Sequence, residues 1–208
     1  MLGAVLVGGH STRFGTDKAA AVLHGRTLLE HQLQTLRLAN ATALAYIGGP
    51  PRQDSASDVI HIPDSFAALS SQHTDNTSVA ESPHGPLVGI IAALAYAQTR
   101  HIEKVVVLAC DVPLVKPSTI TRLVTALHDA EIAVATTDTP QWTIAALRGD
   151  CCAALRTAYL DGHRALHRAF APPTISRVAM VPIDAQESLN ANDGATLIAI
   201  AESMTMDG

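Results

Sequence analysis

The apolar run at residues 4–7, followed at once by two glycines, is the feature that most constrains how this chain can fold. Consecutive apolar side chains predict a strand covered on both faces, as in the parallel sheets of α/β proteins. Gly8 and Gly9 end this strand, and a backbone without side chains lets bare amides converge on an anion. Arg13 and Lys18 then add mobile positive charge. The stretch therefore predicts a polyphosphate site directly after the first strand.

Two common phosphate-binding motifs do not fit this loop. A dinucleotide fingerprint needs GxGxxG and a Walker A loop needs GxxxxGK followed by Ser or Thr, and neither spacing is present. A structural strand-to-helix turn is the plainer alternative, but such a turn does not require charged residues. The pattern GGxSxRxGxDK is matched instead, at Gly8, Gly9, Ser11, Arg13, Gly15, Asp17 and Lys18. It resembles the signature loop of nucleotidyltransferases, and the resemblance implies that the loop wraps an NTP while its Arg and Lys neutralise the triphosphate.

Composition limits the classes of protein that remain. A chain of 208 residues with 48% hydrophobic and 16% charged residues is expected to form one sizeable α/β domain over residues 1–208. A net charge of −5 argues against a nucleic-acid binder. We find no signal peptide and no apolar run long enough to span a bilayer, so no membrane partner is expected. The three cysteines show no CxxC spacing, which favours a reducing compartment and a cytoplasmic location.

Strand and helix patterns alternate along the rest of the chain. We expect further strands at 43–47, 59–62, 105–108, 132–136, 143–147 and 178–183. We expect helices within 23–38, 85–97, 117–128, 150–160, 163–170 and 195–204, the first of them with a capping box at Thr27 and Glu30. Residues 66–84 are polar and aperiodic, and we interpret them as a mobile loop, either a lid or an insertion. The alternation predicts a mostly parallel sheet covered by helices on both sides.

A carboxylate marks the end of a second buried strand. Residues 105–108 are apolar and Asp111 follows at the carboxyl end, where open α/β sheets bind their ligands. A carboxylate opposite a triphosphate loop suits Mg²⁺, which takes one or two carboxylates together with phosphate oxygens. The plainer alternative is a turn capped by Asp111 before Pro113.

Two other groups of residues are interpreted as structural. His163 and His167 have the spacing of a helical pair, but without a third ligand we expect them to face solvent. Cys151 and Cys152 are expected to pack in the core, because no neighbouring base points to a nucleophile.

Several further motifs occur in the order seen in molybdenum cofactor guanylyltransferases, and the resemblance covers almost the whole chain. They are PDS at 63–65, GPLVG at 85–89, CDVP at 110–113, TIAAL at 143–147, DGHRAL at 161–166 and NAN at 190–192. The resemblance implies a three-layer α/β/α Rossmann-like nucleotidyltransferase fold. It also implies transfer of GMP from GTP to the terminal phosphate of molybdopterin, with Mg²⁺ as cofactor and pyrophosphate as the second product. Molybdoenzymes or their chaperones would then be the protein partners.

The resemblance also implies the site residues. Those implied to bind the nucleotide are Leu6, Val7, Gly8, Gly9, Ser11, Arg13, Lys18, Asp64, Gly85 and Asp111. Arg13, Lys18 and Asp111 are the implied catalytic residues, and Asp111 and Asn192 would hold the metal. Arg164, Asn190 and Asn192 are implied on the acceptor side.

The chain departs from the family pattern at two places. Residues 193–196 are DGAT where the family has Thr-Pro-Glu-Asp or a close variant, and residues 48–51 replace an Asn that helps to read guanine. The base therefore stays open, and a CTP-dependent molybdopterin cytidylyltransferase or a sugar-1-phosphate nucleotidyltransferase remains an alternative. A non-catalytic molybdopterin or nucleotide carrier is an alternative of another class, although it would need no metal-binding carboxylate. A nicotinamide-dependent redox enzyme is disfavoured by the missing GxGxxG.

Overall fold

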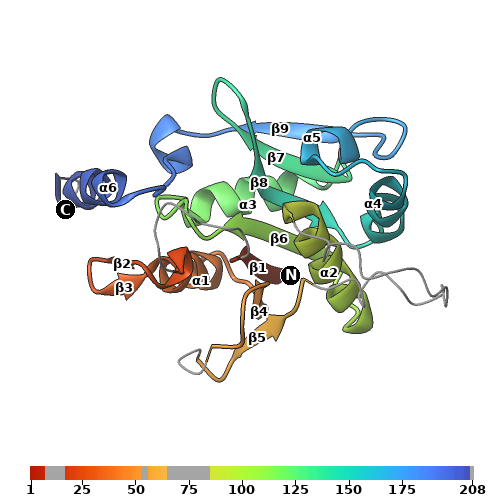
Figure 1. The fold of residues 1–208 in the computed structure, drawn as a ribbon. Coiled ribbons are helices and arrows are strands. Elements are labelled where there is room, and N and C mark those ends of the chain that lie inside the picture. The colour runs from red at the N-terminus through yellow and green to blue at the C-terminus, as the bar shows by residue number, and fades with distance from the viewer. Residues whose placement is uncertain (8–16, 53–55, 65–84, 207–208) are drawn as a thin grey trace.

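The computed structural model describes residues 1–7, 17–52, 56–64 and 85–206, and its centre is one twisted sheet (Figure 1). Seven strands of the described chain form this sheet in the order β5-β4-β1-β6-β8-β7-β9. Their bounds are β1 Leu2–Leu6, β4 Ala43–Ile47, β5 Val59–Ile62, β6 Lys104–Ala109, β7 Ile132–Thr136, β8 Pro140–Arg148 and β9 Val178–Pro182. The strands predicted at 43–47, 59–62 and 132–136 are confirmed at both ends.

Strand directions confirm a mostly parallel sheet, with one exception. β1 pairs in parallel with β4 and β6, β4 with β5, and β7 with β9. β8, which contains the TIAAL segment, runs antiparallel to both of its neighbours. Only residues 137–139 separate β7 from β8, and so short a connection can form a hairpin but not a parallel crossover.

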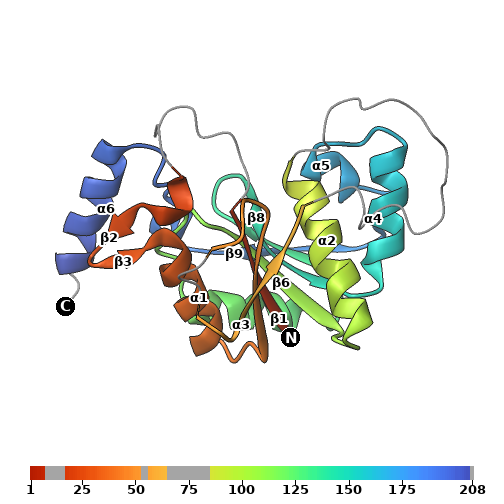
Figure 2. The same ribbon diagram turned by 60° about the horizontal axis from the view of Figure 1, so that its bottom comes forward.

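Helices cover both faces of the sheet and make three layers, which Figure 2 shows with the sheet between them. The helices are α1 Leu28–Leu38, α2 Pro86–Thr99, α3 Pro117–Ala126, α4 Cys151–Leu160, α5 Leu166–Ala169 and α6 Gly194–Met206. One buried apolar cluster joins α1 and α3 to the sheet, and a second joins α2, α4 and α5 to the other face. The predicted α/β/α architecture is confirmed.

The helix α2 packs closely on the sheet because a glycine faces it. A Cβ added at Gly89 would lie 3.0 Å from Leu6 Cδ2 and 3.3 Å from Ile47 Cγ2. Both neighbours end strands of the parallel half, β1 and β4. The absence of a side chain at Gly89 therefore sets the distance between α2 and the carboxyl ends of these strands.

The helix predicted within 23–38 is confirmed, and it begins at residue 28, directly after the predicted cap. The capping box is confirmed: Glu30 N donates to Thr27 Oγ1 at 3.1 Å, and Thr27 N donates to Glu30 Oε2 at 2.7 Å. The residues before it form a hairpin of β2 (Val22–Leu23) and β3 (Arg26–Thr27). His24 and Gly25 both have positive φ, at 46° and 75°, as a two-residue hairpin turn of type I′ requires.

The predicted helix at 163–170 is shorter than expected. α4 ends before Gly162, whose φ is 92°, and α5 begins only at residue 166. His163 therefore lies outside any helix, so the interpretation of His163 and His167 as a helical pair is wrong, although both are exposed as expected. The described residues contain no cluster of three or more His, Cys, Asp or Glu that could hold a metal.

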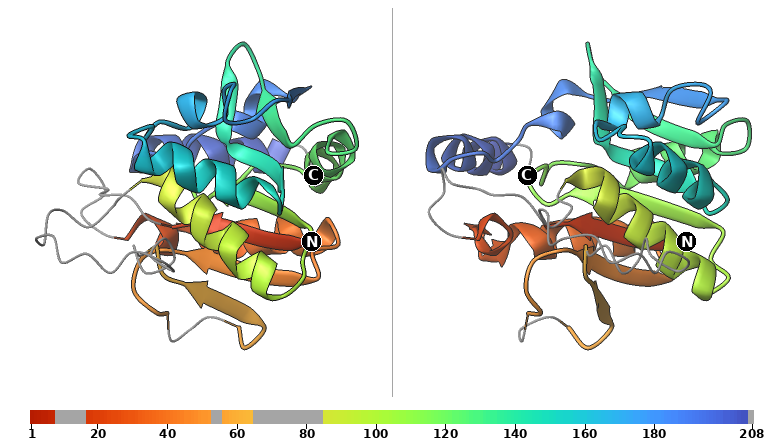
Figure 3. Two further views of the ribbon diagram at one scale, coloured as in Figure 1. Left: turned by 90° about the vertical axis from the view of Figure 1, so that its right-hand side faces the viewer. Right: turned by 45° about the vertical axis from the view of Figure 1, so that its right-hand side comes forward.

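α6 lies at one end of the molecule beside the β2–β3 hairpin (Figure 3). Leu23 and Leu28 meet Ala191 and Ile200 there in a small buried cluster. No helix in the described ranges combines the length and the apolar character that crossing a membrane requires. The loop predicted at 66–84 and most of the glycine loop, residues 8–16, lie outside the described residues.

Candidate active site

Two parallel strands bring the predicted site residues to one edge of the sheet. β1 and β6 are neighbours in register, and Cys110 N donates to Leu6 O at 3.1 Å where both strands end. Val7 N donates to Ile47 O at 3.0 Å and so aligns the end of β1 with the end of β4. Asp111 therefore lies beside the point at which the chain enters the glycine loop. This carboxyl edge is where open α/β sheets bind ligands.

Lys18 contacts two other predicted residues that are far from it in the sequence. It begins a one-turn 3₁₀ helix, η1 (Lys18–Ala20), whose N-cap Asp17 accepts a hydrogen bond from Ala19 N at 3.1 Å. Lys18 Nζ donates to Asp111 Oδ2 at 2.6 Å and to Asn192 Oδ1 at 2.6 Å. Side-chain exposure is 13% for Lys18 and 20% for Asp111, so the ion pair is partly buried and still reaches solvent.

Backbone and side-chain hydrogen bonds fix the turn that carries Asp111. Ala191 N donates to Asp111 O at 2.8 Å, which pins the NAN segment to the CDVP turn. Gln32, fully buried on α1, donates from Nε2 to Val112 O at 2.5 Å. These bonds fix the backbone without using the Asp111 carboxylate, which is left to interact with a cationic group such as the Lys18 ammonium.

The neighbouring thiol, that of Cys110, is buried. Burial, and secondarily the negative charge of Asp111, raises the pKa of Cys110 to about 12. A thiol with that pKa stays protonated near neutral pH, which disfavours it as a nucleophile.

On the other side of the same edge, Asp64 lies against the end of β4. A Cβ added at Gly48, whose φ is 82°, would lie 2.9 Å from Asp64 Oδ2. Gly48 N donates to Ile62 O at 2.9 Å and keeps the two strand ends together. Gly85 is the N-cap of α2 and has a φ of 127°. Asp64 and Gly85, both predicted to bind the nucleotide, therefore lie next to the end of β4 and at the start of α2.

Arg52 is a residue at this edge that the sequence analysis missed. Its guanidinium pairs with the Asp17 carboxylate, and its backbone N donates to Tyr46 Oη at 2.8 Å. The signal that could have found it is an arginine directly after the Gly-Gly-Pro-Pro run at the end of a parallel strand. Arg52 keeps Asp17 occupied and leaves Lys18 to Asp111.

The predicted acceptor residues are only partly brought together. Asn192 joins the Lys18 cluster, whereas Asn190 Nδ2 donates to Ser188 O at 3.0 Å. Arg164 stacks on Tyr159, with its Cζ 3.7 Å from the ring centroid, and donates to the Tyr159 carbonyl. Gly8, Gly9, Ser11 and Arg13 lie outside the described residues.

The donor set fits a hard divalent cation. The Asp111 carboxylate and the Asn192 amide oxygen both bind one cationic group, the Lys18 ammonium, at the same distance. Oxygen ligands of this kind, supplemented by phosphate oxygens and water, are what Mg²⁺ prefers. Asp111 and Asn192 are therefore the described residues that could hold such an ion.

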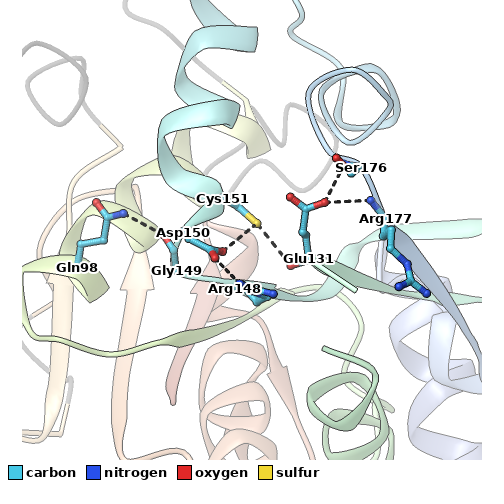
Figure 4. Close-up of polar contacts among 8 residues, drawn as sticks. All are labelled: Gln98, Glu131, Arg148, Gly149, Asp150, Cys151, Ser176 and Arg177. Carbon is cyan, nitrogen blue, oxygen red and sulfur yellow. Dashed lines mark hydrogen bonds and ion pairs between the residues drawn. The ribbon is translucent and has the colours of Figure 1, made fainter. Parts of the chain in front are cut away.

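A hollow lies at the other end of the parallel strands, opposite their carboxyl ends. It has a volume of about 1000 Å³ and is lined by His101, Lys104, His128, Arg148 and Asp150 among others. Figure 4 shows the polar contacts beside it: Gln98 Nε2 donates to Gly149 O at 2.9 Å, and the Glu131 carboxylate accepts from the backbone N of Ser176 and Arg177 at 2.8 and 3.0 Å. These side chains bind the chain's own backbone, so they hold helices and loops to the sheet.

Comparison with known proteins identifies the family of this chain. Residues 3–178 match the family model described as the MobA-like NTP transferase domain. A molybdenum cofactor guanylyltransferase from Rhizobium johnstonii is 33% identical over 144 residues, 65% of this chain and 57% of that protein. A probable molybdenum cofactor guanylyltransferase from Opitutus terrae is 33% identical over 56% of this chain and 50% of its own length. The chain thus spans about half the length of these relatives.

Solved structures show the same fold at low identity. Molybdopterin-guanine dinucleotide biosynthesis protein A from Archaeoglobus fulgidus superposes with a TM-score of 0.73 at 23% identity, covering 99% of this chain and 100% of that one. The 2-C-methyl-D-erythritol 4-phosphate cytidylyltransferase from Thermus thermophilus superposes with a TM-score of 0.69 at 16% identity, covering 98% of each chain. The family match over most of the chain establishes that this chain belongs to the MobA-like NTP transferase family.

Proposed function

We propose that the chain transfers GMP from GTP to the terminal phosphate of molybdopterin and releases pyrophosphate. The observation that carries this proposal is the convergence of Lys18, Asp111 and Asn192 at the carboxyl edge of the sheet. Family membership supports the reaction class, and the similarity to guanylyltransferases supports the choice of the two substrates.

The reaction we propose is a single in-line displacement. An oxygen of the molybdopterin phosphate attacks the α-phosphorus of GTP and forms a new P–O bond. The bond from the α-phosphorus to the oxygen that bridges to the β-phosphorus breaks, and its electron pair leaves with pyrophosphate. No covalent enzyme intermediate is required, so the residues act by positioning and by neutralising charge.

On the donor side we assign the triphosphate to Lys18, Arg13 and the amides of Gly8 and Gly9. The remaining nucleotide contacts are assigned to Leu6, Val7, Ser11, Asp64 and Gly85. Mg²⁺, when bound, supplies positive charge to the phosphates, and Asp111 with Asn192 would hold it. The acceptor is assigned to Arg164, Asn190 and Asn192.

A CTP-dependent reaction on the same acceptor is the second candidate. It is favoured by residues 48–51, where Gly-Gly-Pro-Pro takes the place of the asparagine that helps to read guanine in the family. The Asp64 carboxylate packs against Gly48, so this segment lies beside a predicted nucleotide contact.

We also propose a cytoplasmic location, which the free thiols of all three cysteines support. Molybdoenzymes or their chaperones would then receive the product.

The test is pyrophosphate release from each NTP, measured with and without molybdopterin. GTP is expected to support release only when molybdopterin and Mg²⁺ are both present. If only CTP supported pyrophosphate release, the enzyme would be a cytidylyltransferase instead of a guanylyltransferase. Release with a sugar 1-phosphate instead of molybdopterin would change the acceptor, and binding of GTP without release under any condition would point to a carrier.

A further inference from the structure

The Lys18 ammonium occupies the position that a metal ion held by Asp111 and Asn192 would take. It lies 2.6 Å from Asp111 Oδ2 and 2.6 Å from Asn192 Oδ1, the two oxygens assigned above to the metal. A divalent cation bound to the same two atoms would need the same lone pairs and would repel the ammonium at short range. Lys18 and a divalent cation therefore compete for this position.

The local charges explain why Lys18 lies there. The nearest carboxylate along the chain, Asp17, is already engaged by the Arg52 guanidinium and by Ala19 N. The Asp111 carboxylate is therefore the partner left for Lys18, and short charge-assisted bonds of this kind are strong. The backbone of Lys18 is fixed in η1, but its side chain is long and flexible enough for the ammonium to move to another anion.

We propose that Lys18 is a placeholder for the metal: its ammonium fills the position between Asp111 and Asn192 in the nucleotide-free chain and moves to the triphosphate when an NTP binds. Asp111 and Asn192 are then released together for the divalent cation. This inference rests on the proposed function in one respect, namely that an NTP is the bound ligand. Because the nucleotide favours the state in which the cation position is open, metal and nucleotide bind cooperatively, and the metal alone binds weakly.

The experiment is a titration of the nucleotide-free chain with Mn²⁺, in which free Mn²⁺ is measured by electron paramagnetic resonance. Lys18→Met and Lys18→Gln are each expected to bind Mn²⁺ at least tenfold more tightly than the wild type, since both remove the competing charge. The double variant Lys18→Met/Asp111→Asn is expected to lose this gain. Thermal unfolding of each variant verifies that the chain is folded.

A matched control separates competition from general electrostatics. Arg52→Met also removes one positive charge near Lys18, but Arg52 pairs with Asp17 and with neither Asp111 nor Asn192 in the described contacts. Its Mn²⁺ affinity is expected to stay within threefold of the wild type.

Three results would overturn the proposal. The first is equal Mn²⁺ affinity in the wild type and both Lys18 variants. The second is an equal gain in Arg52→Met, and the third is tight binding that survives Asp111→Asn. The titration contains neither GTP nor molybdopterin, so the expected Mn²⁺ result without any pyrophosphate release would reject the proposed function and leave the competition between Lys18 and the cation standing.

Discussion

The buried carboxylate of Glu187 accepts a 2.6 Å hydrogen bond from the hydroxyl of Thr119, a residue in the first turn of α3. The same oxygen accepts from Lys116 N at 3.0 Å, and the Glu187 residue is only 4% exposed. A carboxylate at a helix N-terminus satisfies amides that would otherwise lack partners and is favoured by the helix dipole. Since the NAN segment begins at Asn190, this contact anchors the approach to Asn192.

Replacing Glu187 by Ala is expected to destabilise the protein by about 1–3 kcal/mol, because Lys116 N and the Thr119 hydroxyl lose their partner in a buried place. The measurement is urea-induced unfolding. Glu103→Ala, which changes an exposed glutamate, should stay within about 0.5 kcal/mol of the wild type. Equal stabilities for the two variants would refute the anchoring role.

Thr27→Ala is expected to lower the free energy of unfolding by about 1 kcal/mol, because it removes the N-cap acceptor of the Glu30 amide. Thr125→Ala is the control, since that hydroxyl bonds only to Thr121 O on the exposed side of α3. Urea unfolding of both variants gives the comparison. A loss no larger for Thr27→Ala than for Thr125→Ala would contradict the cap.

The effect of Thr27→Ala should depend on pH. Hydrogen bonds from the Thr27 backbone and then from its hydroxyl lower the pKa of Glu30 below its ordinary 4.5. A lowered pKa in the folded state contributes stability above pH 4.5, and this contribution is lost as the pH falls through the folded value. The difference in stability between wild type and Thr27→Ala should therefore shrink below pH 4.5. A difference that grows with acidity would be inconsistent with the capping box.

The native protein should not react with a thiol reagent such as DTNB at pH 8. All three cysteines are buried, and burial raises the pKa of Cys110 and of Cys151 to about 12 and raises that of Cys152. In denaturant all three thiols should react. Rapid stoichiometric labelling of the folded protein would instead reveal an accessible thiolate.

Asp111→Ala is expected to reduce pyrophosphate release by at least about 100-fold, because the carboxylate is the charged ligand assigned to the metal. The fold should survive, since the backbone bond from Ala191 N to Asp111 O does not involve the side chain. Asp129→Ala, at an exposed residue just beyond α3, should keep activity within about twofold of the wild type. Activity of Asp111→Ala within a few-fold of the wild type would exclude the assigned role.

Local patterns predicted much of the framework. Apolar runs placed the strands of the parallel half, and the Thr27 and Glu30 spacing predicted the cap of α1. The same reasoning did not foresee the β2–β3 hairpin at residues 22–27, and it failed at residues 163–165, where the chain leaves α4 through Gly162 and is not yet helical. It also left open the direction of β8, because alternation of side chains is the same in parallel and antiparallel strands.

The cluster of Lys18, Asp111 and Asn192 was predicted in part by the sequence and in part only revealed by the tertiary structure. The sequence by itself determined the chemistry: a glycine loop that ends in Lys18, a carboxylate at the end of a buried strand, and an NAN segment. Only the tertiary structure decided that the Lys18 ammonium lies between Asp111 and Asn192, and that Arg52 rather than Lys18 pairs with Asp17. The physical reason is that residue type and spacing fix local backbone and charge. The ion pair of Lys18 with Asp111 across 93 residues, and its hydrogen bond to Asn192 across 174, depend instead on which parts of the chain meet at one edge of the sheet.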